Sequence, residues 1–284
     1  MKLATYIIDN KPVVGVLRGD RLFSLSDQRP LGVQIADGGV FDKTDDTVGV
    51  PIAEVVLVAP LNPRRNILCV GWNYVAHFEE GKGKRGGGLQ DSQTLPEFPT
   101  LFTKSTEAAC GPFEDLPMHA NVTEKIDWEV ELAVIIGKSG VDIAEADALS
   151  HVFGYTVAND VSAREIQRRH GGQWFKGKSL DKTCPLGPVI VTRDEIPDAQ
   201  ALDLGCKVNG VVKQAANTRQ QAFHIPRIIA ELSAGMTLLA GDIILTGTPE
   251  GVGFTREPPE FLAVGDMVET WIENIGVMRN RMVD

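Results

Sequence analysis

The sequence predicts an α+β fold dominated by a mixed, curled β-sheet, and three observations support this prediction. The 284 residues include 29 glycines and 16 prolines, which favours many turns and short strands over a helix bundle. Short β-branched runs bounded by turn residues recur along the chain. Strands and crossover helices do not alternate regularly, so a doubly wound sheet or an α/β barrel is not expected.

The composition narrows the classes of partner. Hydrophobic residues make up 43% and charged residues 23%, which is ordinary for a globular protein with a sizeable core. The net charge of −10 should repel nucleic acid and anionic lipid, so we expect neither a nucleic-acid nor a membrane partner. The first ten residues turn polar too early for a secretory signal, and no apolar run is long enough to span a membrane. The four cysteines have no paired spacing, and the sequence predicts a reduced, cytoplasmic protein.

The N-terminal part reads as short strands joined by turns. Strands are predicted at Ala4–Ile8, Val13–Leu17, Arg21–Leu25 and Val55–Ala59. The prolines at positions 60 and 63 indicate a boundary. We therefore expect a small N-terminal β-rich domain at residues 1–62 and a larger catalytic domain at residues 63–284.

The larger part mixes strands with few helices. Its predicted strands are Ile67–Val70, Trp128–Ile136, Gly154–Ala158, Gly187–Thr192, Leu204–Val208, Asp242–Thr246 and Met267–Ile272. Apolar spacing predicts helices at Ala163–His170 and Ile225–Ala234. The segment Gly81–Gly88 holds five glycines and three cations, so it is either a disordered surface loop or a mobile basic lid over an anion site.

Two glutamates share one face of the strand predicted at Trp128–Ile136. Glu129 and Glu131 alternate with Trp128 and Val130, so their Cα atoms lie about 7 Å apart and their carboxylates can converge on one ion. A solvated strand face is the alternative. Against it, the same face continues with apolar residues, and buried carboxylates require a metal or a cation partner.

A third carboxylate, Asp160, follows the next strand. Ser162 and Glu165 fit a capping box for the helix behind it, so Asp160 is not needed as the cap. Asp160, Arg164 and Gln167 have spacing that would put them on one helical face if the helix extends back that far. Three carboxylates without a cysteine or histidine pattern suit Mg²⁺ or Mn²⁺ better than zinc.

His77 and Glu80 are a candidate acid–base pair. A carboxylate three residues after a histidine on a helical turn can orient the ring and stabilise its charged form, although a surface helix also explains the pattern. The segment Gly172–Ser179 matches the phosphate-loop pattern, but it follows a charged segment and precedes prolines, so a nucleotide-binding enzyme is only a remote alternative. Lys178 in this segment is flanked by small residues and is still predicted to be a cation held at a functional position.

Taken together, these pieces resemble the fumarylacetoacetate hydrolase family, from about Arg65 to the C-terminus. No single piece is specific, but their joint occurrence in this order is. The motifs are Gly71-x-Asn73-Tyr74-x-x-His77-x-x-Glu80, Trp128-Glu129-Val130-Glu131-Leu132, Gly154–Arg164, Gly177-Lys178-Ser179, Val208-Asn209-Gly210 and Leu245-Thr246-Gly247-Thr248-Pro249.

The resemblance implies a mixed β-roll catalytic domain, often with a small N-terminal β domain, in a homodimer. It implies that Mg²⁺ or Mn²⁺, with Ca²⁺ as a possible substitute in crystals, binds three carboxylates. It implies that His77 and Glu80 activate water, with Lys178 as a further catalytic residue. The ligands would be Glu129, Glu131 and Asp160, and the substrate-binding residues Tyr74, Arg164, Gln167 and Thr248.

The resemblance also implies a small anionic keto acid as substrate. The main expectation is a hydrolase that cleaves a C–C bond in an acylpyruvate-like 1,3-dicarbonyl acid through a metal-stabilised enolate. The alternative is an oxaloacetate decarboxylase or a hydroxyheptadienedioate isomerase of the same family, because the same enolate serves those reactions. A non-enzymatic binding module would not need His77 and Glu80.

Overall fold

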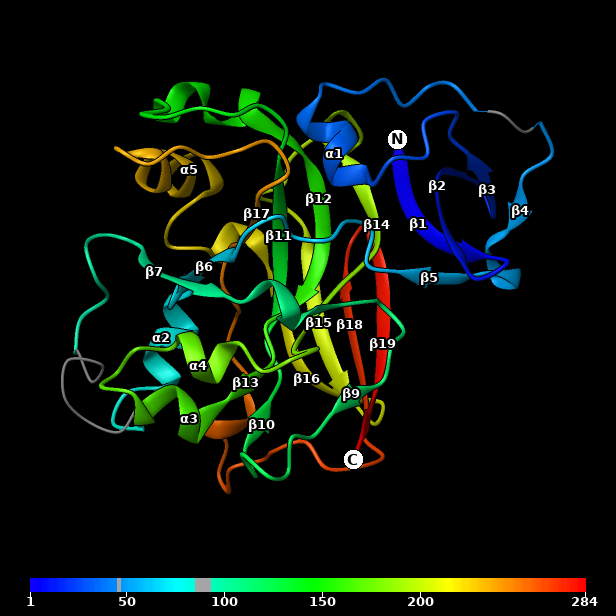
Figure 1. Ribbon diagram of the computed structural model, residues 1–284. Helices are drawn as coiled ribbons and strands as arrows, with labels where there is room; N and C mark the ends of the chain where they lie inside the picture. The colour runs from blue at the N-terminus through cyan, green and yellow to red at the C-terminus, as the bar shows by residue number, and fades with distance from the viewer. Residues whose placement is uncertain (45–46, 85–92) are drawn as a thin grey trace.

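A computed structural model describes residues 1–44, 47–84 and 93–284 of the chain. Its centre is a mixed twelve-stranded sheet in the order β4-β3-β2-β1-β14-β12-β11-β17-β6-β7, with β5 paired to β1 and β8 to β14 (Figure 1). These strands are β1 (Lys2–Ile8), β2 (Lys11–Arg18), β3 (Arg21–Ser24), β4 (Val50–Pro51), β5 (Val56–Val58), β6 (Ile67–Gly71), β7 (Thr100–Lys104), β8 (Ala109–Cys110), β11 (Val130–Ile136), β12 (Val152–Asn159), β14 (Cys184–Thr192) and β17 (Ile243–Leu245).

Within the described residues, two smaller sheets and five α-helices complete the fold. The five-stranded sheet has the order β16-β15-β18-β19-β9, and β10 pairs with β13 alone. Its strands are β9 (Leu116–Pro117), β15 (Asp203–Val208), β16 (Val211–Asn217), β18 (Met267–Ile272) and β19 (Gly276–Val283), and the pair is β10 (Ile126–Asp127) and β13 (Ser162–Ala163). The helices are α1 (Leu31–Ala36), α2 (Val75–Glu80), α3 (Arg164–Arg169), α4 (Phe175–Lys178) and α5 (Ile225–Ser233), and short 3₁₀ turns join other elements.

The predicted fold class is confirmed, because strands dominate and the sheets are mixed. The N-terminal strands belong to the same sheet as the rest of the chain: β1 runs antiparallel to β14, with Lys2 opposite Val191 and Leu3 opposite Ile190. The expected boundary between residues 62 and 63 therefore does not separate two sheets, and a distinct N-terminal domain stays a proposal.

Strand β11 lies in the middle of the large sheet, between β12 and β17. Val130 and Leu132 enter one hydrophobic cluster, and Ala133 and Ile135 enter another. Successive side chains of a strand point to opposite faces, so both faces of β11 are covered. The predicted alternation is confirmed, although the strand begins at Val130, two residues after the expected start.

The predicted helices at Ala163–His170 and Ile225–Ala234 appear as α3 and α5. The expected capping box is wrong: Ser162 Oγ donates to the carbonyl of Asp160, and Glu165 Oε1 accepts from the backbone of Glu124. Asp160 is not on the helical face expected for it either. Because Ser162 pairs in strand β13, the helix begins only at Arg164.

Helix α2 lies near the consecutive helices α3 and α4, although they are far apart in the sequence, and the three gather on the side of β6 and β7 (Figure 1). The segment predicted as a loop or lid, Gly81–Gly88, follows α2; its first four residues form a turn, and residues 85–88 lie outside the described residues. None of the helices in the described ranges is long and apolar enough to cross a membrane.

All four cysteines are free thiols in the core, and we predict that they are unreactive in the folded protein. Burial raises the pKa of each thiol, for Cys110 to about 12, so the nucleophilic thiolate is suppressed at neutral pH. Ellman's reagent at pH 8 should label four thiols only after denaturation with guanidinium chloride. Rapid labelling of the native protein would contradict this burial.

Candidate active site

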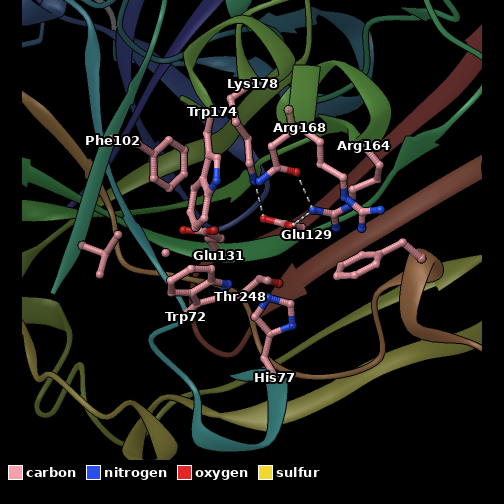
Figure 2. A pocket seen from close by; sticks show the side chains of 14 residues that line it. Trp72, His77, Phe102, Glu129, Glu131, Arg164, Arg168, Trp174, Lys178 and Thr248 are labelled. Atoms are coloured by element: carbon pink, nitrogen blue, oxygen red, sulfur yellow. Dashed lines mark hydrogen bonds and ion pairs between the residues drawn. The ribbon is translucent and has the colours of Figure 1, made fainter. Parts of the chain in front are cut away.

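A cavity of about 40 Å³ lies where α2, α3 and α4 meet the large sheet, and Figure 2 shows its walls. One wall is aromatic, and the other carries guanidinium groups and an amide. The lining side chains labelled in the figure are Trp72, His77, Phe102, Glu129, Glu131, Arg164, Arg168, Trp174, Lys178 and Thr248. Gln167 also lines the cavity.

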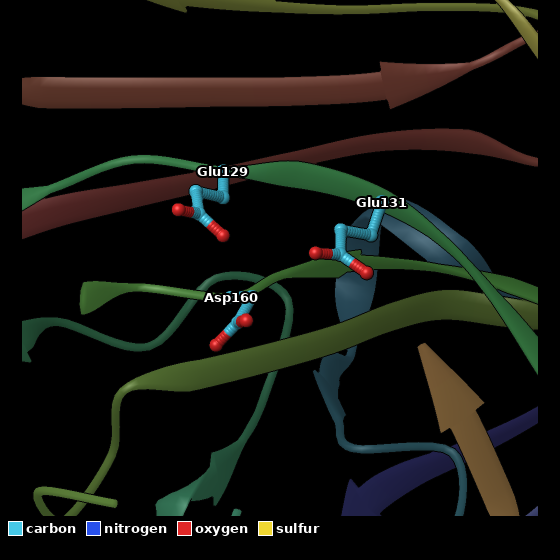
Figure 3. A group of neighbouring side chains, drawn as sticks. All are labelled: Glu129, Glu131 and Asp160. Atoms are coloured by element: carbon cyan, nitrogen blue, oxygen red, sulfur yellow. The ribbon is translucent and has the colours of Figure 1, made fainter. Parts of the chain in front are cut away.

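Three buried carboxylates lie close together (Figure 3), and two of them, Glu129 and Glu131, line this cavity. Glu129 precedes β11, Glu131 lies within it, and Asp160 directly follows β12. Because Val130 pairs with Asn159 across the two antiparallel strands, the start of one strand lies beside the end of the other. Ligand atoms of the three carboxylates lie within 4.8 Å of one another. The expected three-carboxylate group therefore exists in space.

Lys178 makes two ion pairs with this group. Its Nζ lies 2.7 Å from Glu129 Oε2 and 2.7 Å from Asp160 Oδ2. Although burial opposes a charged lysine, the negative charges of Asp160 and Glu129 raise its pKa, so it is an ammonium ion at neutral pH. A cation thus already bridges two of the three carboxylates, which shows that the group accepts positive charge.

Two further cations surround the carboxylates. Lys104, at the end of β7, is fully buried and donates to Asp160 Oδ1 at 2.8 Å. Arg164 donates to Asp127 Oδ2 at 2.8 Å and lies 2.6 Å from Glu129 Oε1. The sequence analysis missed Lys104, because a single lysine at the end of an unpredicted strand carries no local signal.

Glu131 and Glu129 have opposite pKa shifts. Burial raises the pKa of Glu131 well above its usual value, and the neighbouring carboxylates Asp160 and Glu129 raise it further. Burial alone would also raise the pKa of Glu129, but the charges of Lys178 and Arg164 lower it to about 2. Glu131 accepts a hydrogen bond from the backbone of Gly247 at 2.6 Å and has no ion pair among the described residues.

The donor set fits a divalent cation. The three carboxylates offer hard oxygen ligands, and the ionised form of Glu131 is disfavoured without a positive charge beside it. A divalent cation would supply that charge. The acidic group can therefore hold a divalent metal, as the sequence predicts.

His77 and Glu80 form the expected pair on helix α2. His77 Nδ1 lies 2.9 Å from Glu80 Oε1, and Glu80 Oε2 accepts from the backbone of Gly251 at 2.9 Å. A carboxylate at Nδ1 favours the tautomer with its proton there, which leaves Nε2 free as a base. The imidazole is buried and lines the same cavity as the carboxylates (Figure 2).

The other expected residues divide into two groups. Arg164, Gln167 and Thr248 line the cavity, and Arg164 Nη1 donates to Gln167 Oε1 at 3.3 Å. Tyr74 is 1% exposed and is not among the lining residues, so its role in substrate binding stays a prediction.

The phosphate-loop interpretation of Gly172–Ser179 finds no support. The segment follows helix α3 instead of a strand, and the helix within it, α4, has only four residues. Lys178 is occupied by two carboxylates. The context that a phosphate loop requires is therefore missing.

Known proteins show the same combination of fold and motifs. Among curated proteins, the chain is 44% identical over 244 residues to the oxaloacetate tautomerase YisK of Bacillus subtilis, an alignment that covers 84% of this chain and 78% of that protein. It is 44% identical over 235 residues to a human mitochondrial oxaloacetate tautomerase, covering 82% of this chain and 71% of the relative.

Solved structures agree over the whole length. A fumarylacetoacetate hydrolase from Exiguobacterium antarcticum superposes with a TM-score of 0.87 at 38% identity, covering 100% of this chain and 99% of that one. A 2-hydroxyhepta-2,4-diene-1,7-dioate isomerase from Mycobacterium marinum superposes with a TM-score of 0.79 at 32% identity, covering 100% and 98%. The sequence profile described as "Fumarylacetoacetate (FAA) hydrolase C-terminal" matches residues 66–283. The chain therefore belongs to the fumarylacetoacetate hydrolase family.

Proposed function

We propose that this protein is a metal-dependent isomerase that interconverts the keto and enol forms of a small 2-keto diacid, with oxaloacetate as the leading substrate. The observation that carries the proposal is that a carboxylate-oriented imidazole, His77, lines the same cavity as Glu129 and Glu131, which form a group of three buried carboxylates with Asp160. Tautomerisation needs a base for a carbon-bound proton and a way to stabilise an enolate, and this cavity offers both.

The comparisons support an isomerase, the alternative named in the sequence analysis, better than the C–C hydrolase that was the main expectation. Curated relatives that cover most of the chain are oxaloacetate tautomerases, and a solved structure of the same fold is an isomerase. Oxaloacetate decarboxylation remains a second candidate, because loss of CO₂ gives the enolate of pyruvate, which the same groups can stabilise, and needs no attacking water.

The metal would be Mg²⁺ or Mn²⁺, held by Glu129, Glu131 and Asp160. When bound, it supplies a Lewis acid that stabilises negative charge on the oxygens of the keto acid. Lys178 lies beside the same carboxylates and keeps its positive charge, so its ammonium can donate to the enolate oxygen. Lys104 keeps one oxygen of Asp160 in place from the protein side.

His77 moves the proton. Its Nε2 takes a proton from the carbon next to the keto group, and Glu80 stabilises the imidazolium that results. The same proton is then returned to the enolate oxygen. The substrate neither gains nor loses atoms, so the reaction is an isomerisation. The homodimer expected from the family resemblance stays a prediction, and the molar mass of the protein in solution tests it.

Replacing the base should abolish most of the activity. We expect His77→Ala to lower kcat/KM for oxaloacetate tautomerisation by about 10²–10⁴-fold, the usual effect of losing a general base. The rate is measured from the decay of enol absorbance in the presence of Mg²⁺. Glu80→Gln should cost less, because the imidazole remains.

His224→Ala is the matched control, since His224 is exposed and does not line the cavity. It should leave the rate unchanged. If His77→Ala retained the wild-type rate, the imidazole would not be the base.

The raised pKa of Glu131 predicts how stability depends on pH without metal. Below the pKa of an unfolded glutamate, ~4.3, both states carry the proton. Above it the unfolded state ionises while folded Glu131 keeps its proton, so stability falls by about 1.4 kcal/mol per pH unit until the raised folded pKa is passed.

Saturating Mg²⁺ should remove this loss, because it stabilises the ionised carboxylate. Thermal unfolding between pH 4 and 8, with Mg²⁺ and with a chelator, measures both effects. Glu131→Gln should flatten the profile without metal and weaken Mg²⁺ binding, whereas Glu145→Gln, at an exposed site, should do neither. A wild-type profile in the Glu131 variant would contradict the assignment.

A further inference from the structure

A second, larger cavity of about 480 Å³ adjoins the first. The two cavities share three lining residues: Arg164, Arg168 and Phe254. The second cavity has more cations than carboxylates, since Lys84, Lys125 and Arg256 also line it and only Glu165 and Glu257 oppose them. The first cavity therefore adjoins a cationic space, and Arg164, Arg168 and Phe254 stand between the two.

Arg168 differs from the other cations of this space in its partners. Each of the others pairs with a carboxylate: Lys84 with Glu257 at 2.8 Å, Lys125 with Glu165 at 3.8 Å, Arg256 with Glu260 at 3.9 Å, and Arg164 with Asp127 and Glu129. Among the described residues, no carboxylate pairs with Arg168. Its exposed guanidinium donates from Nη2 to the carbonyl of Lys84 at 2.7 Å, and its other donors have no hydrogen-bond partner within the described part of the chain.

Arg164 and Arg168 both stack on Phe254. The guanidinium carbons lie 4.5 Å and 5.4 Å from the ring centroid, so the two cations share one aromatic ring. Arg164 is 4% exposed, and its Nη2 is buried without a hydrogen-bond partner. Partial burial and the positive charge of Arg164 lower the pKa of Arg168. A bound anion would relieve this repulsion and satisfy the unused donors.

Arg164 and Arg168 follow one another from the carboxylate group toward the second cavity. Arg164 contacts Glu129 of the carboxylate group, and Arg168 follows one helical turn later on α3. Figure 2 shows the two guanidinium-bearing side chains on the same side of the cavity. A substrate whose 2-keto acid end lies at the carboxylate group would therefore present its far end to Arg168.

We propose that Arg168 binds the distal carboxylate of the substrate and so selects dicarboxylic 2-keto acids over keto acids with a neutral far end. This inference rests on the proposed function, because it assumes that the keto acid end lies at the carboxylate group. Arg168 is then a specificity-determining residue, and the second cavity gives the distal carboxylate room and a favourable potential.

The test compares two substrates on two variants. Oxaloacetate has a distal carboxylate, whereas acetylpyruvate has an acetyl group in its place. Arg168→Gln should lower kcat/KM for oxaloacetate about 10-fold, as expected for one charge-assisted contact at a partly exposed position, and change that for acetylpyruvate less than twofold. Arg169→Gln is the matched control: it removes the same charge from the next residue, which is exposed and lines neither cavity.

The outcomes separate the two proposals. Oxaloacetate and acetylpyruvate rates that fall equally, or do not fall, in Arg168→Gln would overturn the role of Arg168 and leave the tautomerase proposal standing. A wild-type protein that tautomerises neither substrate would refute the proposed function. Calorimetry of the Mg²⁺-loaded protein would then still test the role of Arg168. Compared with the wild type, Arg168→Gln should have a lower affinity for malate, which has a distal carboxylate. Its affinity for oxalate, which has no distal carboxylate, should be unchanged. Equal affinities of variant and wild type for malate would overturn the inference.

Discussion

The burial of three carboxylates at the junction of β11 and β12 is the constraint around which the site is organised. Carboxylates removed from water require nearby positive charge. Each compensating group comes from a different element: Lys104 from β7, Lys178 from α4 and Arg164 from α3. These elements have six residues or fewer, so they have little stability of their own. The ion pairs of Lys178 and Arg164 attach α4 and α3 to the strand junction and hold both side chains in the cavity wall, whereas β7 already belongs to the sheet through its pairing with β6.

The division of charge around this junction separates two tasks. Glu129 is held ionised by Lys178 and Arg164, whereas Glu131 has only a backbone donor and a raised pKa. The proposed base, His77, stands on a separate element and is oriented by Glu80. Charge stabilisation and proton transfer therefore come from different parts of the chain. Such a site can serve hydrolysis, decarboxylation or tautomerisation of a keto acid, and the choice depends on whether water or a carbon-bound proton meets the imidazole.

The parts of the site with a local periodic signal could be predicted from the sequence. Alternation placed Glu129 and Glu131 on one face, and the three-residue spacing placed Glu80 beside His77. Lys104 and Arg168 could not be predicted, because their surroundings depend on the pairing of β6 with β7 and on loops distant in sequence. The spacing of Asp160 and Arg164 wrongly predicted a shared helical face, because Ser162 and Ala163 pair with β10 and the helix begins only after them. The local sequence pattern determines which face of a strand or helix a side chain occupies, whereas the long-range pairing of strands determines which other side chains it contacts.

The pairing of β1 with β14 means that the N-terminal strands cannot be removed without exposing an edge of the large sheet. β14 is nine residues long, and β1 lies along the end of it that β8 leaves uncovered. Without β1, the backbone groups of β14 at Ile190 and Val191 would form an open sheet edge, which is a template for association with other chains. The N-terminal strands therefore cover an edge of the sheet that carries the site and keep other chains from pairing with it. In this chain, solubility of the catalytic part is linked to a segment that contributes no residue to the cavity.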